Sequence, residues 1–185
     1  LELNIEENST VVFSSTKENY VETSLTIKFH VRLNLDGLVN ETSTELITVT
    51  NYLEYPWIID DSITDRIAYY PTNQGKPSTT PYITAIVRGK GILVYDYKVS
   101  AESNWDYLKV YIDNALVKEY KTLTDWKTDY IQLTKDEQVV KFEYIKDGSG
   151  NSNADKVWIA NLTFASGNKE FTILNNTIDY GLVTA

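Results

Sequence analysis

The sequence lacks several residue types on which protein chemistry often depends. Its 185 residues include no cysteine, no methionine and one histidine, beside only 8 glycines and 4 prolines. Without cysteine the chain can form no disulfide, no thiolate metal site and no thiol nucleophile. The missing methionine, with Leu1 in first place, predicts a mature chain or a fragment cut from a larger protein.

Two further absences concern membranes and nucleic acids. No stretch approaches the roughly 20 apolar residues that a membrane-spanning helix requires, and no charged-then-apolar signal peptide opens the chain. The net charge is −9 and no basic cluster occurs, so phosphate backbones and anionic membrane surfaces would be repelled at long range. We therefore expect neither nucleic acid nor membrane insertion.

The signatures of an enzyme are also sparse. The single histidine, His30, occupies the polar face of an alternating segment with no nucleophile motif nearby. A glycosidase needs two carboxylates across the scissile bond, and of the closely spaced pair Glu143 and Asp147 the second belongs to a glycine-rich turn. The sequence therefore predicts no catalytic residues, and a glycoside hydrolase is only the third hypothesis for function.

The sequence is rich in β-strand character. From Thr23 to Leu33 apolar and polar residues alternate with the period of two that marks a half-buried strand. Further short segments rich in Val, Ile, Tyr and Phe are 46–49, 82–87, 91–99, 108–112, 117–120, 130–133, 139–145 and 157–164. Turn residues separate them, so we predict an all-β, antiparallel two-sheet β-sandwich with at most a helical turn near Ser62 to Ile67.

The strand pattern also sets the expected domain limits and core. Residues 46–165 form the predicted sandwich, whereas 1–45 are either extra N-terminal strands or the end of a preceding immunoglobulin-like domain. Residues 166–185 are either a closing strand or a linker to a next module. The side chains expected to point inward are Leu93, Tyr95, Leu108, Val110, Ile112, Phe142, Trp158, Leu162 and Phe164.

Several segments between Tyr52 and Phe164 together carry a family resemblance. They are Trp57–Asp61, Gly91–Ser100, Ala101–Asp113, Tyr144–Asp147 and Asp155–Phe164. In this order they resemble the jelly-roll modules of bacterial cell-surface proteins, a group with adhesin-like, MAM-like and concanavalin-like members. The resemblance implies jelly-roll topology and a role as a surface adhesive or carbohydrate-binding module.

Individual positions follow the family pattern to different degrees. The chain keeps Glu102, Asp106, Trp126 and Trp158 of that pattern. It departs at Ala160, where the family often carries an acidic residue. That departure argues against a metal-binding or hydrogen-bonding role at this position.

Aromatic residues in loops or at strand ends form the candidate sugar-binding surface. Tryptophan and tyrosine rings stack on the apolar C–H faces of sugars, and such platforms are usually built where loops expose them. Packing beneath a loop is the competing interpretation of each tryptophan, and Trp158, inside an apolar strand, is expected in the core. The predicted ligand-binding residues are Trp57, Tyr69, Tyr70, Trp105 and Trp126.

Carboxylates in two loops are the candidate metal ligands. Calcium takes several oxygen ligands, commonly carboxylates on loops, and related jelly rolls often hold a structural calcium ion. We therefore predict a structural Ca²⁺ at Asp60, Asp61, Glu102 and Asp106. Alternatively these acids are simply solvated, or Glu102 and Asp106 accept hydrogen bonds from loop N–H groups or pair with Lys146.

Together these features favour a non-catalytic extracellular binding module, carbohydrate-binding or adhesive, within a larger secreted or cell-surface protein. Its partners would be a glycan or a surface protein, together with neighbouring domains of the parent chain. The alternative from another class is a structural spacer or protein-interaction domain that has no small-molecule ligand.

Overall fold

The structure is a computed structural model that divides the chain into two units, Leu1–Leu33 and Asn34–Ala185. It describes residue 35 and residues 37–166 in full, and the backbones of four short strands outside them. In the first unit, β1 (Ser9–Ser15) and β2 (Thr23–Phe29) pair antiparallel. His30 and the remainder of the strand predicted to reach Leu33 lie outside the described residues.

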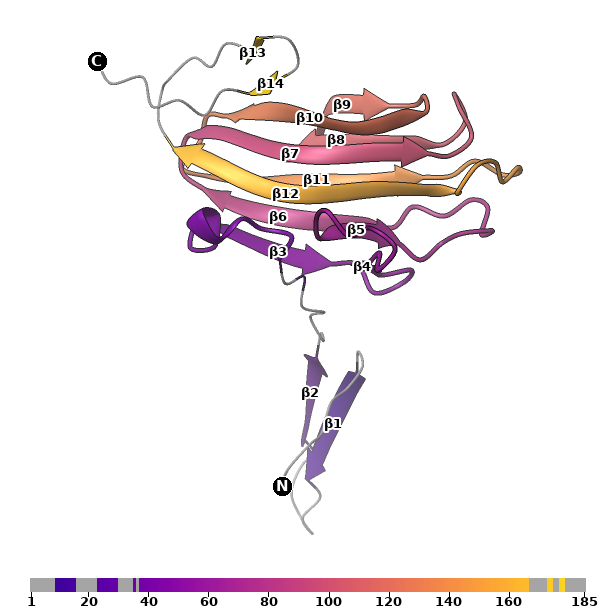
Figure 1. Ribbon diagram of the computed structural model, residues 1–185. Coiled ribbons are helices and arrows are strands. Elements are labelled where there is room, and N and C mark those ends of the chain that lie inside the picture. Colours follow the sequence, from indigo (N-terminus) through magenta and orange to yellow (C-terminus); the bar gives the residue numbers. More distant parts are fainter. Residues whose placement is uncertain are drawn as a thin grey trace. The chain divides into compact units, whose positions relative to one another are not determined.

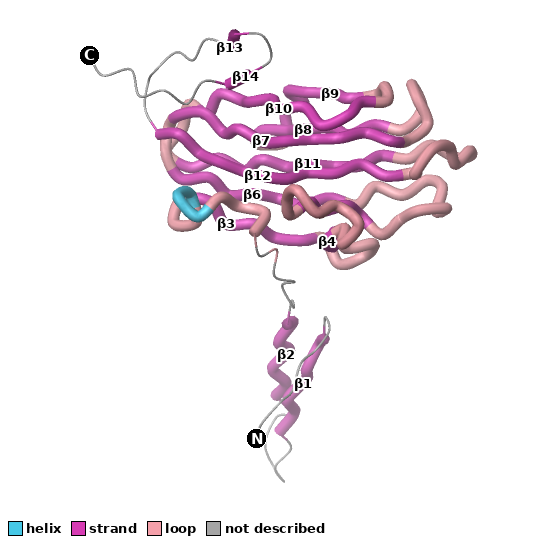
Figure 2. The backbone as a smooth tube through the Cα atoms, viewed as in Figure 1, coloured by secondary structure: helices cyan, strands magenta, loops and turns pink. Residues whose placement is uncertain are grey.

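The second unit is an antiparallel β-sandwich with jelly-roll topology, as predicted (Figures 1 and 2). The first sheet, here the β7–β12 sheet, has the order β10 (Thr124–Leu133), β7 (Gly91–Ser100), β12 (Lys156–Ser166), β5 (Ala68–Pro71) and β4 (Trp57–Ile59). The second, the β6–β11 sheet, has the order β3 (Ile47–Asn51), β6 (Tyr82–Arg88), β11 (Glu137–Ile145), β8 (Tyr107–Ile112) and β9 (Ala115–Tyr120). Near the C-terminus, β13 (Ile173–Leu174) pairs with β14 (Thr177–Ile178), and the rest of the predicted closing segment is not described.

Every strand predicted within the sandwich is present, but two short ones were missed. Both β4 and β5 fall in the region from 54 to 80, where they are too brief to show a periodic pattern and where Pro71 ends β5. Residues 62–67, where the sequence allows at most a helical turn, form no helix. Instead a 3₁₀-helix, η1 (Glu41–Ser43), begins where the Asn40 side chain accepts a hydrogen bond from the Thr42 N–H at 3.0 Å.

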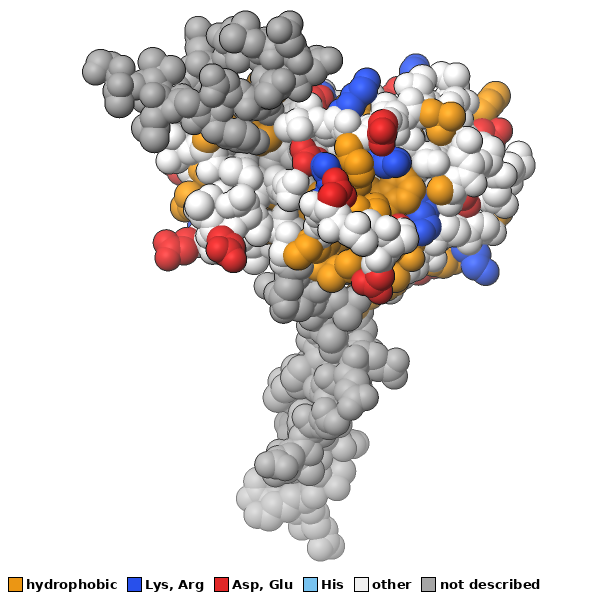
Figure 3. Space-filling view, in the orientation of Figure 1, with side chains coloured by type: hydrophobic (Ala, Val, Ile, Leu, Met, Phe, Trp, Pro, Cys, Tyr) orange, Lys and Arg blue, Asp and Glu red, His pale blue; other side chains and the backbone are white. Residues whose placement is uncertain are grey.

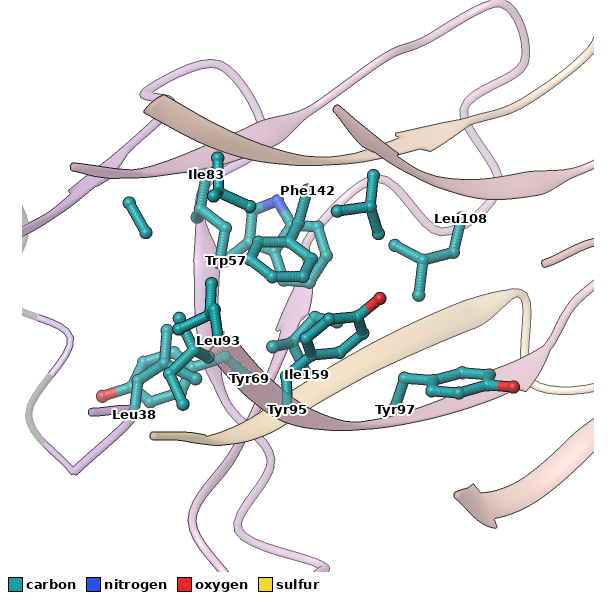
Figure 4. Packing of buried hydrophobic residues seen from close by; sticks show 14 of the residues in the cluster. Leu38, Trp57, Tyr69, Ile83, Leu93, Tyr95, Tyr97, Leu108, Phe142 and Ile159 are labelled. Atoms are coloured by element: carbon teal, nitrogen blue, oxygen red, sulfur yellow. The ribbon is translucent and has the colours of Figure 1, made fainter. Parts of the chain in front are cut away.

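The two sheets enclose one large apolar core between their facing sides (Figure 4). At its centre the Tyr95 and Phe142 rings, one from each sheet, meet edge to face with centroids 5.0 Å apart. The buried Tyr95 hydroxyl oxygen lies 2.6 Å from the Tyr120 hydroxyl oxygen. The Tyr120 hydroxyl donates a hydrogen bond to Asp129 at 2.7 Å. The core also includes Leu38, which is fully buried and precedes residue 46, the predicted start of the sandwich.

The predicted core is confirmed except at one position. Leu93, Tyr95, Leu108, Val110, Phe142, Leu162 and Phe164 are buried in it, and Ile112 packs against it. Trp158 is the exception, because Val157 and Ile159 on either side of it point into the core. Since successive strand residues face opposite ways, Trp158 lies on the outer side of the sheet, in a separate apolar cluster.

Strand β11 offers a direct test of which side is buried. Phe142 is fully buried, whereas Val139 is 40% exposed. We expect Phe142→Ala to lower the free energy of unfolding by about 3–5 kcal/mol through lost packing and a residual cavity. Val139→Ala should cost less than about 1 kcal/mol. Denaturant unfolding of both variants measures the difference, and equal losses would contradict the assigned register.

Candidate functional site

An apolar cluster on the outer side of the β7–β12 sheet is the most developed surface feature of the sandwich. Trp158 of β12 lies over the small side chains of Ala68 and Ala160, and is only 6% exposed although it points away from the core. Tyr70 of β5 and Trp126 of β10, both partly buried, pack around it. We call this surface the aromatic face. Hydrophobic, basic and acidic side chains lie side by side over this part of the molecule (Figure 3).

Basic side chains cover the aromatic rings of this face. The Arg66 guanidinium carbon lies 4.5 Å from the centroid of Trp126, and Lys156 Nζ lies 3.8 Å from that of Tyr70. Lys98 and Lys156 each lie 5.8 Å from Trp158. These distances fall within the range of cation–π attraction, which orders the long basic side chains along the sheet.

Asp96 connects the strands of the aromatic face. Its carboxylate accepts hydrogen bonds from Arg66 Nη1 at 3.0 Å, Thr128 Oγ1 at 2.6 Å and Asn161 Nδ2 at 2.7 Å. Asn161 reaches it from a β-bulge in β12, where its φ is +54° and the register with β7 shifts. The bulge therefore turns the Asn161 amide toward the aromatic face, whereas regular strand pairing would direct this amide elsewhere.

Asp60, at the end of β4, holds the Trp158 indole in place. It accepts from Trp158 Nε1 at 2.9 Å, from Lys156 Nζ at 3.3 Å, and from the hydroxyl and backbone N–H of Ser62. Burial raises the pKa of this carboxyl, but the hydrogen bonds from Ser62, Trp158 and Lys156 outweigh burial and lower the pKa to about 2. Asp60 is therefore an anion at neutral pH.

The structure separates the predicted ligand-binding aromatics into three groups. Tyr70 and Trp126 lie on the aromatic face. Trp57 and Tyr69, 1% and 2% exposed, point into the core instead, so neither can offer a ring to a ligand (Figure 4). Strand alternation explains this, because both precede an outward-facing residue on a short strand. Trp105 is 59% exposed in the loop between β7 and β8.

The four predicted metal ligands do not form one donor set. Asp60 and exposed Asp61 follow β4, whereas Glu102 and Asp106 lie in the β7–β8 loop. Among the described residues no group of three or more acidic or histidine side chains could hold a metal ion. Asp106 accepts from the Asp147 N–H at 3.2 Å, which confirms the alternative interpretation for this residue.

The predicted partner of Lys146 was wrong, since that lysine pairs with Asp155 and not with Glu102 or Asp106. Glu102 Oε2 is buried without a hydrogen-bond partner. Calcium takes six to eight oxygen ligands, and one free carboxylate oxygen does not meet that need. A structural calcium ion stays a prediction, which thermal melts in chelator and in calcium would test.

Except for Asp60, which was predicted as a metal ligand, the polar residues of the aromatic face were not singled out from the sequence. Arg66 lies in a stretch without periodicity, and Trp158 lies among apolar neighbours that hide its direction. One signal was available, because Asp96 and Lys98 alternate with apolar residues along β7. That alternation places both side chains on the outer side of the sheet.

Comparison with solved structures shows similarity in fold. A domain of VesC, a secreted serine protease from Vibrio cholerae, matches with a TM-score of 0.56 and 13% identity over 88% of this chain, which spans 35% of the VesC chain. A carbohydrate-binding module of the β-sandwich superfamily matches with a TM-score of 0.42 and 10% identity. A module of family 29 matches with a TM-score of 0.41 and 17% identity. Those matches cover 89% and 64% of this chain and 77% and 82% of theirs, respectively.

The chain matches no protein-family profile and no curated protein by sequence. None of the described helices could cross a membrane.

The lowered pKa of Asp60 predicts how acid affects stability. An unfolded aspartate titrates near pH 3.9, so a folded pKa of about 2 stabilises the sandwich fully above about pH 4. This contribution is lost as the pH falls from about 4 toward 2. In Asp60→Asn the free energy of unfolding should depend less on pH in that window, and Ser62→Ala should reduce the slope in part. Denaturant titrations at successive pH values measure the slope, and identical slopes in all three proteins would contradict the assignment.

Proposed function

We propose that the protein is a non-catalytic, extracellular glycan-binding module of a larger protein, and that the aromatic face is its binding site. The observation that carries the proposal is the clustering of Tyr70, Trp126 and Trp158 on one sheet face, interleaved with hydrogen-bonding side chains. Aromatic rings accept the apolar faces of sugars, and fixed charged groups bind the hydroxyls. Because the residues come from strands and from short loops next to them, the surface is preorganised.

The charge of the face favours a neutral sugar chain. Its ion pairs join Arg66 to Asp65 and Asp96, Lys98 to Asp125, and Lys156 to Asp60. Three basic groups therefore face four acidic ones, within a chain whose net charge is −9. A polyanion would meet no excess of positive charge, whereas hydroxyl groups can both donate to the carboxylates and accept from the cations.

The state of the carboxylates supports binding over catalysis. Asp60 and Asp96 each accept hydrogen bonds from three protein side chains. A pKa of about 2 makes Asp60 unsuited to act as a general acid near neutral pH. Both residues hold the surface in shape, as a static binding face requires.

Exposed apolar residues on edge strands favour a second candidate function, protein interaction. Ile58 and Ile59 on edge strand β4 are 40% and 42% exposed, and Leu116 and Val117 on edge strand β9 are 50% and 40% exposed. Edge strands can pair with strands of another chain. Concentration-dependent association in sedimentation experiments, abolished by Ile58→Lys and without glycan binding, would favour this function.

Glycan binding is tested with a glycan array followed by titration of the best neutral oligosaccharide. Trp126→Ala and Tyr70→Ala should each weaken binding by about tenfold or more, as loss of a central aromatic contact usually does. The control is Trp105→Ala, which removes an exposed tryptophan outside the aromatic face and should leave affinity unchanged. Thermal melts confirm folding of each variant. A folded wild-type domain that binds no glycan would refute the proposal, and a loss confined to Trp105→Ala would place the site in the β7–β8 loop.

A further inference from the structure

A second group of polar side chains is buried where β11 and the following loop meet β12. Lys146, the residue after β11, has a side chain with 0% exposure, and its Nζ contacts Oδ2 of Asp155, which is 8% exposed. Asn151 Oδ1 lies 3.0 Å from the same nitrogen. A lysine is almost never fully buried unless it is paired, so this amine and this carboxyl are held together away from water.

Hydrogen bonds to neighbouring loops hold both residues in place. The Lys146 N–H donates to the Thr79 carbonyl at 3.0 Å. Asp155 has a φ of +52°, and its Oδ2 also accepts the Gly75 N–H at 2.7 Å. The two reactive groups therefore face each other as one preorganised pair, which raises their effective concentration.

Tyr144 links this pair to a second acidic residue. Its hydroxyl oxygen lies 3.1 Å from Asp155 Oδ1 and 3.2 Å from Asp106 Oδ2. The hydroxyl is the donor toward both carboxyls, so it joins the two acids in one hydrogen-bonded chain. Burial raises the pKa of Asp106, whereas Asp155 faces the Lys146 ammonium. Asp106 is therefore the acid that accepts a proton more readily than an ordinary aspartate, and Tyr144 connects it to Asp155.

We propose that Lys146 and Asp155 react to form an intramolecular amide bond, an isopeptide cross-link between the end of β11 and the start of β12. This site is separate from the aromatic face, and the inference does not depend on glycan binding. The chain contains no cysteine, so an amide would be its means of covalent reinforcement.

The reaction needs no other reagent. A proton passes from the Lys146 ammonium to the Asp155 carboxylate, which leaves a neutral amine and a neutral carboxylic acid. The amine lone pair attacks Cγ of Asp155, so that the Nζ–Cγ bond forms. The Tyr144 hydroxyl gives its proton to the departing oxygen, the Cγ–O bond breaks, and one water molecule leaves. The new amide nitrogen gives up its extra proton, which Asp106 accepts and passes to Tyr144, and the charges of Lys146 and Asp155 have both disappeared.

Intact-mass spectrometry of the folded, then denatured, full chain tests the inference. The wild-type mass should be lower than that of the sequence by one water molecule, and digestion should yield one peptide pair joined through Lys146 and Asp155. Lys146→Arg keeps the positive charge and should have the full mass. An unmodified wild-type mass after prolonged incubation would overturn the inference. Loss of ammonia instead of water would also overturn it, since that product requires Asn151.

Further variants separate the proton relay from a purely structural role. Tyr144→Phe and Asp106→Asn should fold, as judged by circular dichroism, yet show a cross-linked fraction at least tenfold lower at equal times. Asp106→Glu keeps the acid and should restore the reaction in part. The matched control is Lys135→Arg, because Lys135 pairs with Asp113 at an exposed site and its replacement should not affect the cross-linked fraction. Full cross-linking in folded Asp106→Asn and Tyr144→Phe would contradict the relay.

Discussion

The hydrogen bond from the Trp158 indole to Asp60 is the contact on which the aromatic face depends. Trp158 points outward from a strand whose neighbouring residues fill the core, so both sides of β12 are apolar. A buried indole N–H requires an acceptor, and Asp60 supplies one at 2.9 Å. The same carboxylate binds Lys156, which lies over Tyr70. One buried acid thus sets the positions of two rings and one cation.

Two of the buried acids, Asp60 and Asp106, show how surroundings decide the direction of a pKa shift. Burial raises the pKa of both, but Asp60 is bonded to a lysine, an indole and a serine, and its pKa falls to about 2. Asp106 accepts from the Asp147 N–H and from the Tyr144 hydroxyl, but burial outweighs these hydrogen bonds and its pKa is raised. The hydrogen-bond partners, and not burial alone, therefore decide whether the pKa of a buried acid falls or rises.

The strand pattern of the sequence was sufficient to predict the sandwich but not the composition of the site. Alternation within the longer strands identified the inward residues, as for Leu93 and Tyr95. It failed at Trp158, because a strand that is apolar on both sides has no period from which to read direction. It also failed at Trp57, on a strand of three residues. The position of Arg66 depends on a loop, and that of Asn161 depends on a β-bulge. Strand pairing across the sheet determines the bulge.

The indole N–H signals of the four tryptophans test the central claim most directly. They can be followed by nuclear magnetic resonance while a neutral oligosaccharide is added to the whole chain. The account predicts that the signals of Trp126 and Trp158 shift and saturate together, whereas those of buried Trp57 and of Trp105 in the loop stay in place. Shifts confined to Trp105, or saturating shifts in none of the four, would contradict a glycan site on the aromatic face.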